Sequence, residues 1–341
     1  MRLHARKLVY ARPLVSSLAA PELNRLAPAD PGQRSRLDKV DRRANGALKW
    51  LALGGGALVF LVLLAIVYQI LSGASGAFDK FGFAFIVHKD WVPASAQFGA
   101  WTFIYGTLVT GVGSVLLSTI LGVSIGLFLS LMAPRRVAAI IGPLVEMLAA
   151  IPSVIIGLIG IYLICPFIKT DIEPWVHSAF GWIPIFGAPE PVGNSIFAAI
   201  LVLTIMVVPI IAALTRDLFL TVPGELRDGA EALGATRWEM IRGVVIPTTQ
   251  SGIVAASILG FGRAVGEAIA VAQVVGGVPA DPIDLFKGGY TGASLIANTF
   301  ISPVSNLNTS ALFYIAAILL VIGITSNLTA QRISRSFGRA R

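Results

Sequence analysis

Three ionisable side chains lie within long apolar stretches of the sequence: Glu146, Arg263 and Glu267. At the centre of a lone membrane helix such a group costs about 2.5–3.5 kcal/mol, so each must face a partner, the protein interior or water. Arg263 and Glu267 are four residues apart, a spacing that places them on one helix face where they can pair. A guanidinium keeps its charge when desolvated and donates a fork of hydrogen bonds, so the cluster predicts a path for an anion.

Each of these assignments has a structural alternative. Arg263 and Glu267 can be a buried ion pair that only fixes helix packing, and Glu146 can be a snorkelling or interhelical hydrogen-bonding residue. Pro152 follows Glu146 in the same stretch and predicts a helix break, which membranes tolerate where the break lines a cavity.

Catalytic and metal-binding functions have little support in the sequence. The chain has one cysteine, Cys165, and three isolated histidines, so we expect no metal site and no internal disulfide. Glu146 and Glu267 as an acid/base pair of a membrane enzyme are a remote alternative, because no nucleophile or cofactor motif accompanies them. We therefore expect no catalytic residues.

The elements that hold these residues are predicted to be six transmembrane helices. Of the 341 residues, 55% are hydrophobic and 13% charged, whereas a soluble domain needs more polar surface. A helix needs about 20 apolar residues to cross the hydrocarbon core. Six stretches qualify, at roughly 48–71, 101–132, 138–166, 194–215, 248–276 and 310–330. They lack the alternation of a membrane β-barrel.

The distribution of lysine and arginine predicts the orientation. Most of the 26 basic residues lie in the N-terminal tail, the 133–137 loop, the 216–247 loop and the C-terminal tail. The other three loops hold only Lys80, Lys89, Lys169 and Lys287. Because basic and basic-poor loops alternate without a break, we expect an all-α integral membrane protein with cytoplasmic N and C termini.

The N-terminal region is interpreted as two parts. Residues 1–47 form a basic cytoplasmic tail, too long for the n-region of an ordinary signal peptide, and residues 48–71 form a first transmembrane anchor that is not cleaved. The net charge of +8 lies largely in the tails that flank apolar segments. We therefore expect anionic membrane lipid as a partner, and no nucleic acid, since no nucleic-acid-binding motif is present.

The cytoplasmic loop at about 222–247 predicts two short helices. Helical spacing runs from Glu225 to Leu233, with Gly234 as a C-cap. Thr236 is a candidate N-cap of the second helix, and Glu239 completes a capping box. An amphipathic loop lying on the bilayer is the alternative interpretation.

This loop resembles the EAA loop of ABC importer permeases. The residues that match the family's spacing, with the acidic residue that opens the helix, are Glu225, Asp228, Ala230, Gly234 and Pro247. Asp228 stands where glutamate is usual and Gly229 where alanine is usual, and Gly229 should weaken the helix by about 0.5–1 kcal/mol. The resemblance implies a coupling helix that docks into a groove of an ATPase subunit.

Two membrane stretches extend the resemblance to one type of ABC importer permease. Residues 146–157 read Glu-x-Leu-Ala-x-Ile-Pro-Ser-Val-x-x-Gly, and residues 262–271 read Gly-Arg-Ala-x-Gly-Glu-x-x-Ala-Val. Both are similar to the C-type permease (PstC) of bacterial high-affinity phosphate importers. The resemblance implies the type I ABC importer permease (MetI-like) fold in a bacterial cell (inner) membrane. It makes residues 101–332 the permease core and inorganic phosphate the substrate.

The resemblance also implies partners and the source of energy. They are an A-type phosphate permease, a dimer of ATP-binding subunits and an extracytoplasmic phosphate-binding protein. This chain has no P-loop, because none of its lysines follows a glycine. We expect no cofactor on this chain, with ATP and Mg used by the partner ATPase.

Three rival functions stay open at this point. The chain can be an A-type phosphate permease, or a permease for another oxyanion such as molybdate or sulfate, with an unchanged fold. It can also be a secondary transporter or channel that needs no ATPase, for which inverted repeats would be support.

Overall fold

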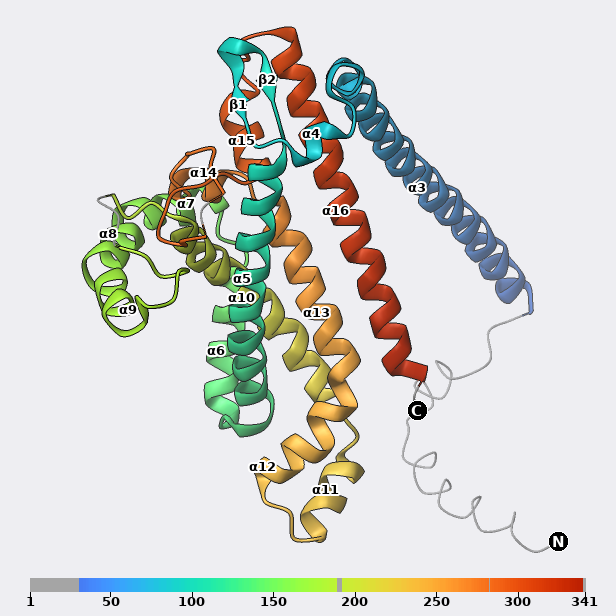
Figure 1. Ribbon diagram of the computed structural model, residues 1–341. Helices are drawn as coiled ribbons and strands as arrows, with labels where there is room; N and C mark the ends of the chain where they lie inside the picture. Colours follow the sequence, from blue (N-terminus) through green and yellow to red (C-terminus); the bar gives the residue numbers. More distant parts are fainter. Residues whose placement is uncertain (1–30, 189–191, 282, 340–341) are drawn as a thin grey trace, which may run out of the picture. The chain divides into compact units, whose positions relative to one another are not determined.

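The computed structural model describes residues 31–188, 192–281 and 283–339 (Figure 1). The chain divides into two compact units, residues 1–67 and 68–341. Residues 1–30, most of the predicted tail, lie outside the described residues.

The described part of the first unit belongs to one helix, α3 (Pro31–Phe81), which contains the predicted anchor 48–71. Large apolar side chains on all its sides, such as Trp50, Leu58 and Phe60, are exposed. A helix that is apolar all round is suited to lipid.

The second unit is a set of helices whose longest connections are residues 181–195, before α10, and 275–291, before α15. Its elements are α4 (Ala84–Val87), β1 (Trp91–Val92), β2 (Gln97–Phe98), α5 (Trp101–Leu127), α6 (Arg135–Leu148), α7 (Ser153–Ile159), α8 (Cys165–Phe167), α9 (Glu173–Phe180), α10 (Ile196–Leu220), α11 (Gly224–Ala232), α12 (Arg237–Met240), α13 (Ile246–Gly266), α14 (Ile269–Val274), α15 (Gly292–Thr299) and α16 (Asn306–Arg339). π-Helical turns extend α5 to Met132 and join α7 to α8, α8 to α9, and α12 to α13. β1 and β2 pair antiparallel, with Trp91 opposite Phe98.

Within the described residues, six helical segments are long and apolar enough to cross a membrane, which agrees with the predicted number. They are Leu48–Phe81, Trp101–Met132, Ser153–Phe180, Ile196–Leu220, Arg237–Gly266 and Asn306–Thr329.

Two of the predicted spans are interrupted: the third at Pro152, where the sequence predicts a helix break, and the fifth after Gly266, where it predicts none. In the third, α6 ends at Leu148 and α7 begins at Ser153, because Pro152 holds an extended ψ of 134° and has no N–H to continue the ladder. In the fifth, α13 ends at Gly266. The backbone of Glu267 is extended, and its carboxylate accepts a hydrogen bond from the Ala270 N–H at 3.4 Å. This hydrogen bond connects the residue that follows α13 to the first turn of α14.

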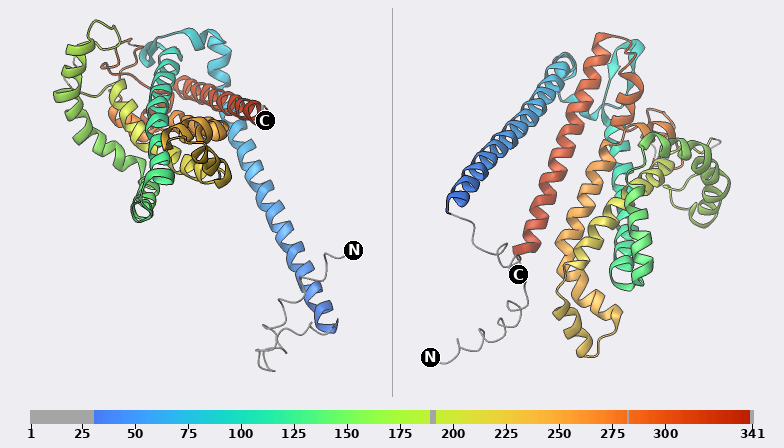
Figure 2. Two further views of the ribbon diagram at one scale, coloured as in Figure 1. Left: turned by 90° about the horizontal axis from the view of Figure 1, so that it is seen from below. Right: turned by 180° about the vertical axis from the view of Figure 1, so that it is seen from behind.

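α5 and α10 pack side by side at the centre of the second unit (Figure 1, Figure 2). Glycines make the approach possible, since a Cβ added at Gly113 would lie 2.9 Å from Ile200 Cδ1, and one at Gly122 would lie 2.8 Å from Ile211 Cγ2.

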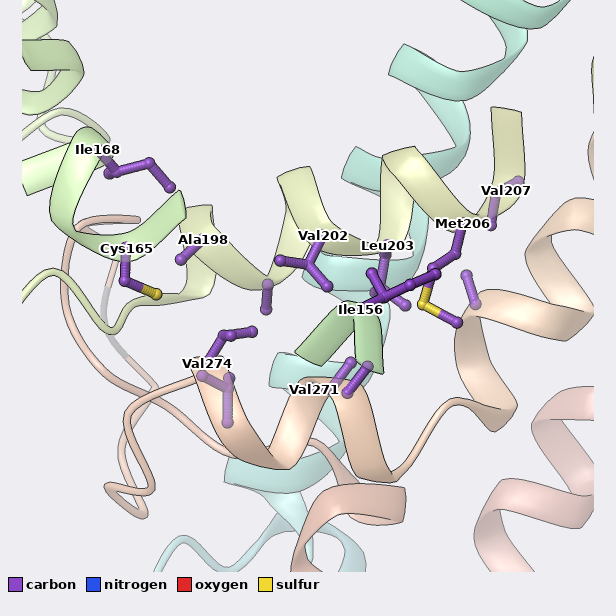
Figure 3. Close-up of a cluster of buried hydrophobic side chains, with 14 of the residues drawn as sticks. Ile156, Cys165, Ile168, Ala198, Val202, Leu203, Met206, Val207, Val271 and Val274 are labelled. Carbon is purple, nitrogen blue, oxygen red and sulfur yellow. The ribbon is translucent and has the colours of Figure 1, made fainter. Parts of the chain in front are cut away.

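The largest group of buried apolar side chains also centres on α10. Figure 3 shows Val202, Met206 and Val207 of α10 gathered with Ile156 of α7 and Val271 of α14. α10 therefore joins the helices that follow both breaks.

Gly106 of α5 gives a test of this packing. An added Cβ there would overlap the carbonyl oxygen of Tyr290. We expect Gly106→Ala to lower stability by about 1–3 kcal/mol, since backbone must move to admit the methyl group. Thermal unfolding in detergent would measure the loss. Gly55→Ala is the control, because a Cβ at Gly55 meets nothing within 4 Å; equal midpoints for the two variants would contradict the packing.

Candidate functional site: a cleft beside α13 and a two-helix loop

An open cleft beside α13 contains two of the three predicted path residues. It has a volume of about 590 Å³, and its lining includes Arg263 and Glu267. The other lining residues are Ile210 of α10, Ile258, Leu259, Gly262 and Gly266 of α13, and Gly323, Ser326 and Asn327 of α16. Charged, amide and hydroxyl groups therefore converge on a mostly apolar wall.

Arg263 presents its charge to this cleft. Its side chain is exposed, whereas Glu267 is half-buried. The salt bridges found in the described part of the chain are Lys89–Asp281 and Arg216–Glu146, so the expected pair between Arg263 and Glu267 is not formed. The reason is the helix end at Gly266, which removes the four-residue register that pairing requires.

The cleft face of α13 is open along its backbone. An added Cβ at Gly262 or Gly266 would meet no other atom within 4 Å, and the same holds for Gly323 on α16. A second cleft of about 570 Å³ shares these three glycines. The described residues thus leave room beside Arg263 for a ligand or another polypeptide.

Glu146 lies elsewhere in the structure. Its Oε1 accepts a hydrogen bond from Nη1 of Arg216 at 2.9 Å, and the described lining of the cleft does not include it. The interhelical alternative considered for Glu146 is thus the contact that the structure contains.

Sequence reasoning missed Arg216. It was assigned to the loop after the fourth span, but α10 continues to Leu220. The signal that could have found it is the lack of a helix breaker between the apolar stretch and Pro223.

The predicted coupling loop forms two helices, α11 and α12. Thr236 and Glu239 form the capping box, with the Glu239 N–H donating to Thr236 Oγ1 at 3.3 Å and the Thr236 N–H donating to Glu239 Oε2 at 2.8 Å. Gly234 has φ +86°. The Ala235 N–H donates to the Ala230 carbonyl and the Gly234 N–H to the Glu231 carbonyl, which is a Schellman motif.

An apolar cluster ties this loop to the ends of α10 and α13. Its buried members are Phe219, Val222, Met240, Ile241 and Val245, and Ala230 packs against them. On the outside of the loop, Leu233 is 91% and Trp238 63% exposed. Glu225, Asp228 and Pro247 are also exposed. α11 and α12 lie at one end of the second unit, away from the β-hairpin and α15 (Figure 1), where they can contact a partner.

The opposite end of the second unit contains two polar contacts to one carboxylate. Asp281, in the loop between α14 and α15, accepts from Lys89 Nζ at 2.7 Å and from Trp101 Nε1 at 3.1 Å. The Lys89 ammonium holds the pKa of the Asp281 carboxyl below its usual value. These contacts fix the loop beside the start of α5.

Within the described residues, six helices long and apolar enough to cross a membrane, an open cleft with an exposed cation and a protruding two-helix loop are features expected of a membrane transport subunit. Comparison with known families identifies which family of transport subunits the chain belongs to. The family described as "Binding-protein-dependent transport system inner membrane component" matches residues 118–339, and the chain belongs to this family.

Individual relatives within this family are similar to the chain over most of its length. The chain is 37% identical over 299 residues to the phosphate transport system permease protein PstC of Mesorhizobium japonicum, covering 86% of this chain and 91% of the relative. It is 38% identical to PstC of Pasteurella multocida, covering 82% and 90% of the two chains. The resemblance predicted from the two membrane stretches is confirmed.

Solved structures show the fold. A bacterial alginate ABC transporter matches with a TM-score of 0.53 and 17% identity, covering 87% of this chain and 99% of that chain. The inward-facing MetNI methionine ABC transporter matches with a TM-score of 0.50 and 18% identity, covering 68% and 93%. The predicted fold class and the location as a multi-pass bacterial inner membrane protein are confirmed. The domain bounds 1–47, 48–71, 101–332 and 222–247 stay predictions.

Proposed function

We propose that this chain is the permease subunit of an ATP-driven importer of inorganic phosphate and forms the translocation path together with a second permease. The observation that carries the proposal is the exposed guanidinium of Arg263 in an open cleft, in a chain whose relatives are named phosphate permeases. An A-type permease or a permease for molybdate or sulfate remains the alternative.

The cleft has the chemistry that a transient phosphate site needs. Arg263 supplies a permanent charge with a fork of donors, while Ser326 and Asn327 offer further donors on the facing helix. Glu267, in the same cleft, repels the anion and prevents binding too tight for release, which conduction requires. That Glu146 and the break at Pro152 belong to the path stays a prediction, and Glu146 lies outside the described lining of the cleft.

Energetics support coupling to ATP. Moving a charge against the membrane potential costs about 2.3 kcal/mol per 100 mV, so a phosphate dianion faces about 4–5 kcal/mol before any concentration gradient. A passive pore would leak phosphate outward. A passive channel is therefore a poor fit, whereas a secondary transporter driven by an ion gradient is distinguished by the requirement for ATP.

The proposed partners bind at the two opposite ends of the second unit and beside the cleft. Glu225, Asp228, Ala230, Gly234 and Pro247 would form the part that docks on an ATP-binding subunit dimer, which would use ATP and Mg while this chain is non-catalytic. The opposite end would receive an extracytoplasmic phosphate-binding protein, and an A-type permease would lie beside the cleft.

Purification and reconstitution test the proposal. Mild-detergent purification of the tagged chain is expected to bring down an ATP-binding subunit and a second permease. In proteoliposomes with the binding protein, labelled phosphate uptake should require ATP and be unaffected by excess sulfate or molybdate. Competition by either oxyanion would contradict phosphate as the specific substrate. Uptake without the ATPase would overturn the assignment as an ATP-driven importer.

A further inference from the structure

The break at Pro152 leaves α6 as a separate short helix that packs on α10 and forms an ion pair with it. Besides the 2.9 Å bond between Glu146 Oε1 and Arg216 Nη1, the guanidinium lies against Gly142. A Cβ there would approach Nη1 to 2.8 Å. The missing side chain at Gly142 therefore provides the space that Arg216 occupies.

The opposite face of α6 has no such attachment among the described residues. Ile140 is 65%, Leu144 54% and Met147 67% exposed. Since these side chains form one stripe at helical spacing, the described contacts that set the position of α6 come from the side of α10. Among these contacts the ion pair is directional, because a charged hydrogen bond joins Glu146 Oε1 to Arg216 Nη1.

Arg216 lies close to the apolar cluster that packs the coupling loop against the end of α10. It lies one turn before Phe219, which is fully buried in the apolar cluster with Met240 and Ile241. The preceding residue, Thr215, lies so close to α5 that an added Cβ at Gly126 would overlap its hydroxyl. Packed side chains therefore connect α11 and α12 to the end of α10, and Arg216 connects that end to Glu146.

We propose that the Glu146–Arg216 pair makes α6 move with the cytoplasmic end of α10, so that a shift of the coupling loop reaches the helix break that precedes α7. The two residues are positioning residues for transport, and Glu146 acts through Arg216. The proposal rests on the proposed function only in requiring an importer permease with an ATPase partner, since it holds for any transported anion.

Charge exchange is the test. Glu146→Gln and Arg216→Gln are expected to leave assembly and binding-protein-stimulated ATP hydrolysis intact. Each should raise the ATP hydrolysed per phosphate imported about tenfold, because the stroke no longer reaches α6. The double variant Glu146→Arg with Arg216→Glu should restore the ratio by re-forming the pair in reverse. Asp217→Asn, which removes an exposed carboxylate next to Arg216, is the matched control and should leave the ratio unchanged.

The outcomes separate this proposal from its rivals. If the single variants keep the wild-type ratio, the pair does not transmit the stroke. If the exchange fails to restore the ratio, Glu146 has its own role on the anion path. If the single variants lose assembly and ATP hydrolysis together with uptake, the pair is only structural. Each of these results overturns the proposal, while a wild-type complex that imports no phosphate would instead count against the proposed function.

Discussion

Arg263→Ala is expected to abolish phosphate uptake while the complex of membrane and ATPase subunits still assembles. The arginine is exposed in the cleft and forms no salt bridge within the described residues, so its removal leaves no unpaired carboxylate partner in the fold. Uptake should fall at least about a hundredfold, the loss typical of truncating a charged hydrogen-bonding partner. Initial rates of labelled phosphate uptake in proteoliposomes would measure it.

Two variants show whether geometry or charge matters at this position. Arg263→Lys keeps the charge but loses the planar fork, so uptake should be intermediate. Lys169→Ala removes an exposed cation from the π-helical turn before α9, outside the described cleft, and should be close to wild type. If Arg263→Ala transports normally, the guanidinium is not on the path and its role is structural.

The number of spans and the break at Pro152 could be predicted from the sequence, but the break after Gly266 could not. Hydropathy counts apolar residues, and it does so correctly for α5, where residues 101–132 are helical throughout. Hydropathy carries no information about one or two residues that adopt a non-helical backbone conformation within an apolar stretch. At Pro152 the missing N–H was a visible signal, whose effect is a full break. At Glu267 the backbone becomes extended and the carboxylate accepts a hydrogen bond from the Ala270 N–H, and neither feature has a signature in hydropathy.

The site was predictable where a local rule applied. The cost of a charge in lipid pointed to Arg263 and Glu267 without any structure, and both line the same cleft. The partner of Glu146 was not predictable, because Arg216 is distant in sequence and meets it only through the packing of α6 on α10. Contacts between distant residues depend on helix placement, which spacing along one helix does not determine.

The second prediction with a large expected effect concerns Gly234. Its φ of +86° is a conformation that side-chain-bearing residues adopt at a cost of about 1–2 kcal/mol. The Schellman motif that it allows sets the direction of the chain from α11 to α12. Gly234→Val should therefore tilt the two helices and weaken docking of the ATPase subunit, with uptake reduced at least about tenfold. Pull-down of the ATPase subunit, with ATP hydrolysis measured on the same samples, would check this.

Matched substitutions separate backbone strain from added bulk. An added Cβ at Gly234 meets nothing within 4 Å, and neither does one at Gly229 in α11, so bulk alone affects both positions equally. Gly229→Ala relieves a helix-weakening glycine and should keep or strengthen docking. Gly234→Asn should retain more docking than Gly234→Val, since asparagine tolerates the left-handed region. Equal loss in all three variants would mean that any substitution in the loop blocks the ATPase groove, and wild-type coupling in Gly234→Val would remove the turn from the coupling mechanism.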